Sequence, residues 1–259
     1  MGITEWFQSI LKRVGQFQLE QQKNIKPAGT DYKSRIDLVT DVDRESERRI
    51  VEALGGKFPA DGILAEEEIT REAENNRRWI IDPLDGTTNF VHRHPFFGIS
   101  VALQENDRIT AGYTYFPVLD NFYHAREGEP AYKNGAEITV STPKKPVESL
   151  LATGFADMRT EDERYNLPVF NRIIKKVRGI RRAGSAVHDL CMVAEGVFDG
   201  FWEFNLAPWD VAAGALIVRS AGGKVTDMEG GDNWLEGKRI VASNTHLHDQ
   251  LLEWIQMSG

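Results

Sequence analysis

One short segment of the sequence places two carboxylates where an apolar strand would end. The segment WIIDPLDGTTNF covers residues 79–90, and Asp82 and Asp85 stand three positions apart with a proline between them. A tight turn at this point would direct both carboxylates toward one place beyond the strand. Gly86 permits close approach of the backbone to a ligand, and a helix that begins at Thr87 would offer free N–H groups to an anion. Carboxylates for a hard cation beside amides for a phosphate are the groups that metal-assisted phosphate chemistry uses.

A simpler interpretation of this segment is a strand followed by a turn, because aspartates are common turn formers and helix caps. Two other acidic positions favour the metal site. Three glutamates at residues 66–68 come directly after an apolar run, and Asp210 follows Pro208 and Trp209 at the start of an apolar helix. Alone, the glutamates are typical of a solvated face and Asp210 of a first-turn acid stabilised by the helix dipole. Together with the 79–90 segment, they indicate a shared site.

Other reactive residue types fit structural roles better. Cys191 lies in a helical pattern where a core cysteine is expected, and as the only cysteine it excludes an intramolecular disulfide and a cysteine-based zinc site. His92 and His94 stand two positions apart before a proline, without further ligands, and this favours a surface loop. The arginines within 178–182 could bind an anionic substrate, or they could belong to a solvated strand or a subunit contact.

The composition is that of an ordinary globular protein. The 259 residues are 41% hydrophobic and 27% charged, with a net charge of −8. This charge argues against a nucleic-acid-binding surface spread over the whole chain. The longest apolar candidate, residues 96–103, is much shorter than the ~20 residues of a membrane span. The N-terminus lacks the order of charged and apolar regions found in signal peptides. We therefore expect a cytoplasmic protein with no membrane and no nucleic-acid partner.

The apolar pattern predicts two regions of different character. In the first, helices at 5–22 and 43–54 flank a polar loop at 23–35, and short β-type runs follow. The β-type runs and the two hairpin turns between or after them cover these residues: strands 63–65, 79–82, 98–104, 109–116 and 121–126, and turns 105–107 and 133–135.

In the second region strands and helices alternate. The expected strands are 149–153, 179–182, 200–204, 223–226 and 239–242, and the expected helices are 162–176, 185–195, 208–221 and 246–257. The proline-flanked segment 141–147 is the best internal boundary. We therefore expect one unit over residues 1–259, with a metal and phosphate subregion at 1–143 and a substrate-side subregion at 144–259.

Five segments match a known set of motifs in order and in compatible spacing. They are DLVTDVD at 37–43, LAEEE at 64–68, WIIDPLDGTTNF at 79–90, GSA at 184–186 and PWDVAAGALIVRSAGG at 208–223. Through them the chain resembles the magnesium-dependent, lithium-sensitive inositol monophosphatase family of sugar phosphatases. The resemblance implies a layered α+β fold, the αβαβα sandwich of these phosphatases, and a homodimer.

The resemblance also implies which residues would hold the metal ions. Glu66, Asp82 and the carbonyl of Leu84 would hold a first Mg²⁺, which activates water. Asp82, Asp85 and Asp210 would hold a second Mg²⁺, which stabilises the leaving oxygen. Two hard cations that clamp an in-line displacement need about four carboxylates and no protein nucleophile. The number of ions, two or three, stays open.

Further roles implied by the resemblance concern water and phosphate. Thr87, hydrogen-bonded to Asp43, would orient the attacking water. Backbone groups of Gly86 and Thr87 would hold phosphate oxygens. Glu67 would support the ligands from behind or bind a weaker metal ion.

The alcohol part of the substrate would contact Asp85, Ala186 and Glu203. Some family members have a histidine three residues before the metal-binding aspartate, where this chain has Ala207, so one substrate contact is missing. The implied activity is hydrolysis of a small phosphomonoester, most simply myo-inositol 1-phosphate. Fructose 1,6-bisphosphate is the second substrate to consider, and a regulatory, protein-binding role on the same fold is the alternative of another class.

Overall fold

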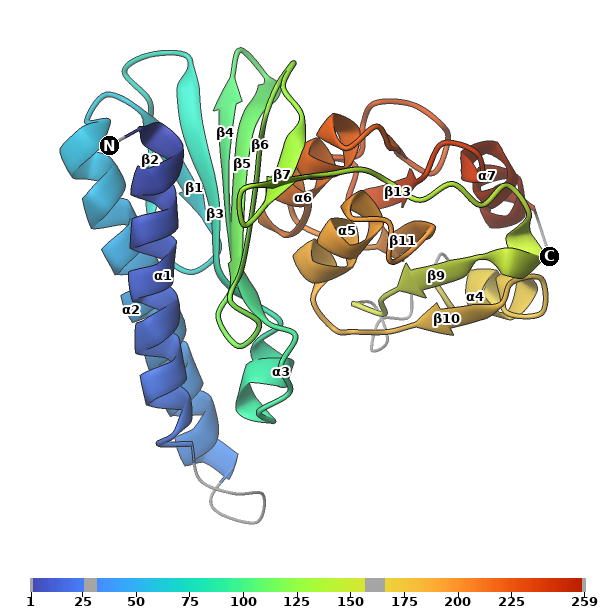
Figure 1. Ribbon diagram of the computed structural model, residues 1–259. Helices are drawn as coiled ribbons and strands as arrows, with labels where there is room; N and C mark the ends of the chain where they lie inside the picture. Colours follow the sequence, from blue (N-terminus) through green and yellow to red (C-terminus); the bar gives the residue numbers. More distant parts are fainter. Residues whose placement is uncertain (1, 26–31, 157–165, 258–259) are drawn as a thin grey trace.

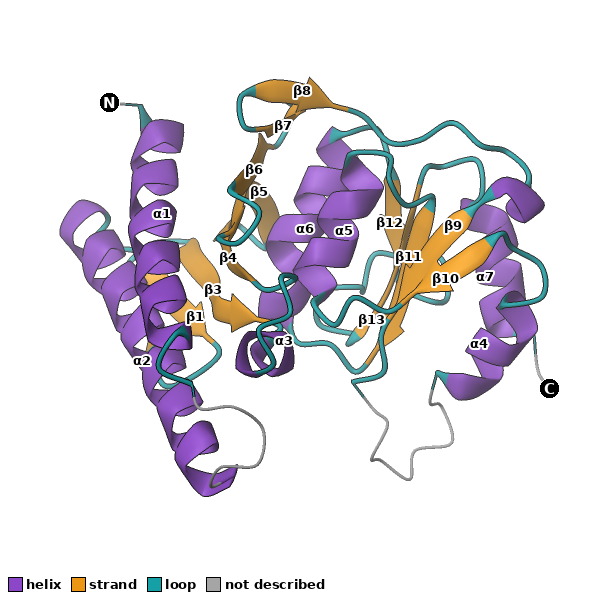
Figure 2. Ribbon diagram, turned by 60° about the horizontal axis from the view of Figure 1, so that its bottom comes forward, coloured by secondary structure: helices purple, strands orange, loops and turns teal. Residues whose placement is uncertain are grey.

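Five layers alternate between helices and sheets. The structure is a computed structural model that describes residues 2–25, 32–156 and 166–257. A pair of helices, a large sheet, a second pair of helices, a smaller sheet and a last pair of helices follow one another across the molecule (Figures 1 and 2). This is the αβαβα sandwich that the sequence led us to expect.

The first outer layer consists of two long helices, α1 (Ile3–Gln22) and α2 (Tyr32–Lys57), which pack on one face of an eight-stranded sheet. The strand order is β2-β1-β3-β4-β5-β6-β7-β8, and only the β1–β3 pair is parallel. The strands are β1 (Gly62–Ala65), β2 (Thr70–Arg71), β3 (Arg77–Asp85), β4 (Gly98–Glu105), β5 (Arg108–Phe116), β6 (Asn121–Arg126), β7 (Ala131–Lys133) and β8 (Ala136–Ile138).

Strand β3 is apolar on both sides because helices cover both faces of the sheet. Trp79 and Ile81 join the core beneath α1, where the ring of Phe7 stacks on Tyr113 with centroids 3.9 Å apart. Ile80, between them, belongs to the core on the opposite face. Buried on both faces, β3 gives a rigid base to the residues at its C-terminal end.

The middle layer consists of α5 (Ala186–Ala194) and α6 (Pro208–Ser220), which are buried over most of their length. Small residues let them approach their neighbours closely. A Cβ added at Gly112 of β5 would lie 2.9 Å from the carbonyl oxygen of Ala213, and one added at Gly214 would lie 2.7 Å from Leu190. The sequence therefore places α6 directly against the large sheet and α5.

The second sheet has five strands in the order β10-β9-β11-β13-β12. Its outer face is covered by α4 (Leu167–Ile173) and α7 (His248–Gln256) (Figure 2). The strands are β9 (Leu150–Thr153), β10 (Gly179–Arg181), β11 (Gly200–Phe204), β12 (Lys224–Thr226) and β13 (Arg239–Ser243), and two short helices complete the fold, α3 (Thr87–Val91) and the 3₁₀ helix η1 (Pro146–Glu148).

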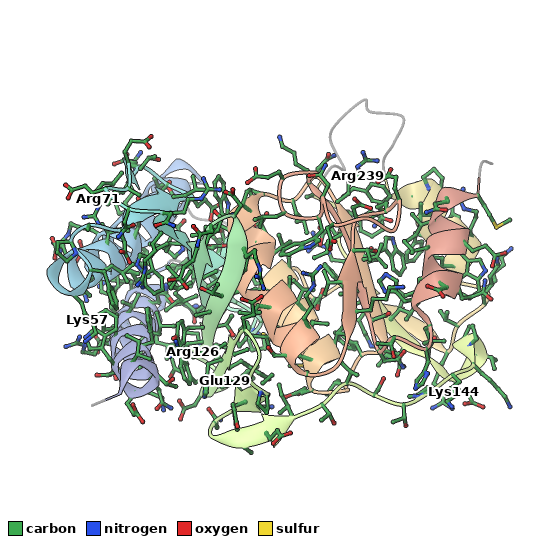
Figure 3. All side chains as sticks on the ribbon, turned by 90° about the horizontal axis from the view of Figure 1, so that it is seen from above. Lys57, Arg71, Arg126, Glu129, Lys144 and Arg239 are labelled. Carbon is green, nitrogen blue, oxygen red and sulfur yellow. The ribbon has the colours of Figure 1, made fainter. Side chains whose placement is uncertain are left out.

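The view from above shows side chains filling the spaces between the layers, with charged residues such as Lys57 and Lys144 at the periphery (Figure 3). Residues 139–149 connect the two sheets, and Asp199 fixes both ends of this connection by accepting hydrogen bonds from Ser141 Oγ and the Leu150 N–H, each at 2.6 Å. None of the described helices is both long and apolar enough to cross a membrane.

Two expectations about helices were wrong in extent. Helix α2 begins at Tyr32 and continues through the two glycines to Lys57, so residues 32–35 are helical and not a loop, while 26–31 lie outside the described residues. Residues 32–35 are mostly polar and show no apolar helical spacing, so the apolar pattern did not indicate that the helix begins here. The expected helix at 162–176 is seen only as α4, because Pro168 favours the first helical turn; residues 162–165 are not among those described.

Candidate active site

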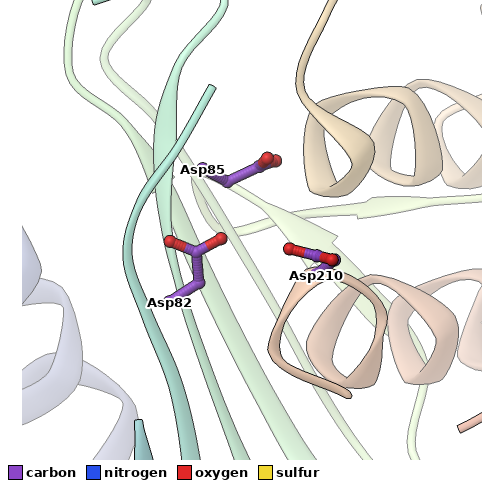
Figure 4. Close-up of side chains that lie close together, drawn as sticks. All are labelled: Asp82, Asp85 and Asp210. Carbon is purple, nitrogen blue, oxygen red and sulfur yellow. The ribbon is translucent and has the colours of Figure 1, made fainter. Parts of the chain in front are cut away.

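Three aspartates meet where the large sheet faces the middle helices. One carboxylate oxygen from each of Asp82, Asp85 and Asp210 lies within 4.8 Å of the other two (Figure 4). Asp82 and Asp85 come from the end of β3, and Asp210 comes from the first turn of α6. The structure thus brings together residues from the two halves of the chain, as the sequence predicted.

The end of β3 is irregular, and this irregularity aims both aspartates at α6. Residues three apart in a regular strand point to opposite faces. Here the pairing of β3 with β4 shifts its register between Asp82 and Asp85. The N–H of Leu84 turns back to donate to Asp82 Oδ1 at 2.9 Å, and Gln18 of α1 donates to the carbonyl of Pro83 at 2.7 Å. The turn is therefore fixed from both sides.

The turn continues through Gly86, and the backbone conformation at this position requires a glycine. Its φ is +88°, and an added Cβ would lie 2.9 Å from the carbonyl oxygen of Phe96. Helix α3 then begins at Thr87, as expected from the sequence, and the Phe90 N–H donates to the Gly86 carbonyl at 3.0 Å. The first N–H groups of α3 consequently lie next to the aspartates in the chain.

Asp85 is held by the start of helix α5. Ser185 Oγ donates to Asp85 Oδ2 at 2.5 Å, the Val187 N–H donates to the same oxygen at 2.8 Å, and the Ala186 N–H donates to Oδ1 at 3.3 Å. Burial raises the pKa of Asp85, and these hydrogen bonds oppose that rise.

The pKa values of the other two aspartates are also raised by burial and by neighbouring carboxylates. Burial raises the pKa of Asp210 to about 7, with the charge of Asp85 adding to the rise, while a hydrogen bond from the Ala207 N–H at 2.7 Å opposes it. Burial raises the pKa of Asp82 well above its usual range, and the charges of Glu66 and Asp85 raise it further. A buried set of carboxylate oxygens with excess negative charge fits a hard divalent cation such as Mg²⁺.

Glu66 joins this cluster at its exposed edge, directly after β1. Its carboxyl is hydrogen-bonded to that of Asp82, which raises the pKa of Asp82 and opposes the rise in the pKa of Glu66. Loss of solvation is nevertheless the main cause of the raised pKa of Glu66. Two carboxyl groups can share a hydrogen bond only if one of them is protonated, so Glu66 and Asp82 titrate as a pair.

Glu47 positions the glutamate turn and was missed in the sequence. It is buried in α2 and accepts hydrogen bonds from the N–H groups of Glu67, Glu68 and Ile69 at 2.8, 3.0 and 2.8 Å. The sequence does contain a sign of this: Glu47 stands three positions before the buried Ile50, so a charged residue lies on the apolar face of a helix. Burial raises the pKa of Glu67, and the charge of Glu47 adds to this.

One expected hydrogen bond is absent. The Thr87 hydroxyl donates to the carbonyl of Leu84 at 3.2 Å, so its single proton does not go to Asp43. The tight turn at 85–86 brings that carbonyl within reach and explains the correction. Asp43 itself is buried in α2, and its Oδ1 has no hydrogen-bond partner. Burial, together with the charges of nearby glutamates, raises its pKa to about 8.

A pocket of about 200 Å³ is lined by two of the three aspartates, Asp85 and Asp210. Asp85, Ala186 and Glu203, which we expected to contact the alcohol part of a substrate, all line it, as does Asp210. Glu203 of β11 is only 7% exposed, and burial, followed by the charges of Asp189 and Asp85, raises its pKa well above the usual range. A larger cavity of about 510 Å³ elsewhere contains none of the expected site residues.

Comparison with known proteins gives the same assignment. The model of the inositol monophosphatase family matches residues 3–258. The chain belongs to the inositol monophosphatase family. A protein named putative Nus factor SuhB from Neisseria meningitidis is 44% identical over 94% of both chains, and an inositol-1-monophosphatase from Rhizobium meliloti is 42% identical over 86% of this chain and 85% of its own. The crystal structure of the extragenic suppressor protein suhB from Bartonella henselae is similar with a TM-score of 0.89, at 34% identity over 99% of both chains.

Membership in the inositol monophosphatase family makes this chain a phosphomonoester hydrolase. Enzymes of this family generally depend on Mg²⁺, and the cluster of Asp82, Asp85 and Asp210 is an acidic site able to bind a metal ion.

Proposed function

We propose that the protein hydrolyses a small phosphomonoester, most simply myo-inositol 1-phosphate. The observation that carries the proposal is the position of the three-aspartate cluster beside the pocket lined by Ala186 and Glu203. The phosphate would bind at the cluster and the alcohol part in the pocket. The relative from Rhizobium meliloti, named inositol-1-monophosphatase, supports this substrate.

Two sets of residues would hold Mg²⁺. Glu66, Asp82 and the carbonyl of Leu84 form one set, and Asp82, Asp85 and Asp210 form the other. When bound, Mg²⁺ supplies Lewis-acid activation of water and neutralises charge on the phosphate. Asp82 belongs to both sets, and its location at the fixed end of β3 suits a ligand shared by two ions.

The remaining residues orient the reactants. The Thr87 hydroxyl, which donates to the Leu84 carbonyl, accepts a hydrogen bond from the attacking water and orients it. The N–H groups of Gly86 and Thr87 donate to phosphate oxygens. The carboxyl of Glu203 forms a hydrogen bond with a substrate hydroxyl. Glu67 supports Glu66 from the neighbouring turn.

The proposal includes the expected organisation of the protein. Residues 1–143 supply most of the metal and phosphate site, and 144–259 supply Asp210 and the alcohol pocket. A cytoplasmic homodimer remains the expected form.

Phosphate release from a panel of substrates tests the proposal. The panel contains myo-inositol 1-phosphate, fructose 1,6-bisphosphate and an aryl phosphate, each with Mg²⁺ and with excess chelator. We expect turnover that requires Mg²⁺ and is fastest with the inositol ester, and inhibition by Li⁺ with Na⁺ and K⁺ as controls for ionic strength. Faster turnover of fructose 1,6-bisphosphate would make it the preferred substrate in place of myo-inositol 1-phosphate. Full turnover in excess chelator would overturn the metal-dependent mechanism.

A second function as a regulatory binding protein is favoured by one observation. The Neisseria meningitidis relative and a relative from Pseudomonas aeruginosa, 42% identical, are named as Nus factors. The net charge of −8 favours a protein over a nucleic acid as the direct partner. Replacement of the gene by one encoding Asp82→Asn tests this role. If deletion of the gene causes a phenotype and the inactive variant still corrects it, the function behind that phenotype does not depend on catalysis.

A further inference from the structure

Asn89 forms a buried connection between the two halves of the site. It lies in α3, is 8% exposed, and uses both hydrogens of its amide group. Nδ2 donates to the carbonyl of Phe96 at 2.6 Å and to the carbonyl of Ala183 at 2.8 Å. Phe96 precedes β4 in the first half of the chain, whereas Ala183 lies just before α5 in the second. One side chain therefore ties the start of α5 to the turn that carries Asp85.

The backbone of Ala183 is held from two directions. Its carbonyl accepts from Asn89, and its N–H donates to the buried carboxylate of Asp189 in α5. The next residue, Gly184, packs flat on the Asn89 amide: a Cβ added there would lie 3.1 Å from both Nδ2 and Oδ1 of Asn89, and φ is +87°. These contacts leave the segment little freedom before Ser185.

The same segment supplies three hydrogen-bond donors to Asp85. Ser185, Ala186 and Val187 come directly after the part of the chain held by Asn89. Without another anchor, the hydrogen bonds to Asp85 would have to hold residues 185–187 in place. The same carboxylate would also have to point toward Asp82 and Asp210. Asn89 contributes a separate anchor, so the direction of the Asp85 carboxylate toward Asp82 and Asp210 does not depend on Asp85 alone.

We propose that Asn89 is a positioning residue that sets the orientation of Asp85 and, through it, the affinity of the three-aspartate cluster for a divalent cation. This inference rests on the proposed function for the identity of the cation. It predicts that loss of the Asn89 amide lowers the affinity for a divalent cation of the ligand set that spans both halves of the chain, Asp82, Asp85 and Asp210. The set of Glu66, Asp82 and the Leu84 carbonyl lies entirely in the first half and should be affected less.

The test compares Asn89→Leu with Asn244→Leu. Asn244 is a suitable control because it too is buried, at 1% exposed, and also donates twice through Nδ2, to Ser141 Oγ and to the Pro143 carbonyl, each at 3.0 Å, away from the cluster. Mn²⁺ binding to the full chain is measured from the free-ion signal in electron paramagnetic resonance, which needs no turnover. We expect Asn89→Leu to weaken one class of Mn²⁺ site about 10-fold or more. Asp210→Asn should weaken the same class, whereas Asn244→Leu should bind like the wild type.

Hydrogen exchange of the metal-free proteins gives a second measurement. We expect faster exchange of the 185–187 amides in Asn89→Leu and unchanged exchange there in Asn244→Leu. If Asn89→Leu does not fold, Asn89→Ser, which keeps one donor, takes its place. Wild-type Mn²⁺ affinity together with unchanged exchange in the Asn89 variant, or equal losses in both variants, would overturn the inference. A wild-type protein that binds no Mn²⁺ would instead overturn the proposed function, and the exchange rates would still decide whether Asn89 holds this segment.

Discussion

At the scale of single residues, the site is marked by carboxyl groups that raise one another's pKa. Burial is the largest cause of the raised pKa values of Asp82, Asp85 and Asp210, and neighbouring carboxylates raise the pKa values of Asp82 and Asp210 further. A stable core avoids such an arrangement, because each uncompensated buried charge costs several kcal/mol or forces protonation. Raised pKa values gathered in one place are therefore typical of a functional site.

Glu203 offers a change that separates recognition from chemistry. Glu203→Gln keeps the size of the side chain and its ability to form hydrogen bonds, and removes a charge that burial already disfavours. We expect kcat/KM for myo-inositol 1-phosphate to fall by a factor that corresponds to about 1–3 kcal/mol, because a contact to a substrate hydroxyl is changed. The kcat/KM value for an aryl phosphate should stay near that of the wild type. Steady-state kinetics on both esters measures the difference. Equal losses on both would contradict the role of Glu203.

Thr87 offers the opposite separation. Thr87→Ala removes the hydroxyl that would orient water and leaves the carboxylates in place. We expect kcat to fall roughly 10²-fold on every substrate, which corresponds to about 3 kcal/mol. Thr88→Ala is the control, since Thr88 is an exposed threonine in the same helix. If both variants turn over at the wild-type rate, the hydroxyl of Thr87 has only a structural role.

At the scale of elements, the site depends on the tight connection between β3 and α3. The shift in register at the end of β3, the left-handed conformation of Gly86 and the start of α3 at Thr87 follow one another without a spacer. The β3–α3 turn and the start of α5 therefore fix each other, because Asp85 of the turn accepts hydrogen bonds from α5.

Gly86→Ala tests this connection against a matched glycine. Gly86 and Gly135 have φ values of +88° and +83°, but a Cβ at Gly86 would meet the Phe96 carbonyl at 2.9 Å, whereas one at Gly135 would meet nothing within 4 Å. We expect Gly135→Ala to lower the free energy of unfolding by about 1 kcal/mol through backbone strain alone. Gly86→Ala should lower it by a further ~1–3 kcal/mol and abolish Mg²⁺-dependent turnover. Thermal unfolding and kinetics of both variants give the comparison, and equal effects would show that the close approach at Gly86 is unimportant.

The elements with strong local signals were predictable from the sequence. The apolar run at 98–104 predicted a strand, and residues 133–135 predicted a hairpin turn, and the structure contains both. The positions of the acidic motifs predicted the aspartate cluster, because strand ends and helix starts gather at one edge of the layers. Strands β2, β7 and β8 were missed: each has only two or three residues, which is too short for periodicity to show.

What the sequence did not reveal is mostly a matter of side-chain partners across distant segments. Glu47 and Asn89 are fixed by backbone groups that lie far away in the chain, and a single sequence carries no direct record of such pairs. The direction of the Thr87 hydroxyl likewise depends on a turn whose geometry had to be seen.

At the scale of the whole molecule, the site joins two sheets through the middle helices. Its negative charge makes the stability of the protein depend on both pH and divalent cations. The pKa of Asp43 rises to about 8 and that of Asp210 to about 7 from the usual 3.8, so the folded state binds more protons than the unfolded state in this range. The free energy of unfolding therefore decreases as pH rises from about 4 to about 8, to the extent set by these groups.

Thermal unfolding with and without Mg²⁺ tests this dependence. We expect Tm in chelator to be lower at about pH 8.5 than at about pH 5.5, because the clustered carboxylates lose their protons. Mg²⁺ should raise Tm more at the higher pH, since it binds carboxylates that are already deprotonated. Asp82→Asn should reduce both effects. Equal Mg²⁺-induced shifts at the two pH values would show that protons and the cation do not compete for this cluster.

The position of Asp210 has a consequence for the protein while it is being made. Asp82 and Asp85 leave the ribosome long before α6 has been synthesised. Helix α6 also covers the face of the large sheet on which Ile80 lies. An unfinished chain thus has an open sheet and a pair of carboxylates without their third member. If Asp210 is needed for hydrolysis as proposed, we expect no turnover until α6 has been synthesised and has packed against the large sheet, so activity would appear only after both halves of the chain have met.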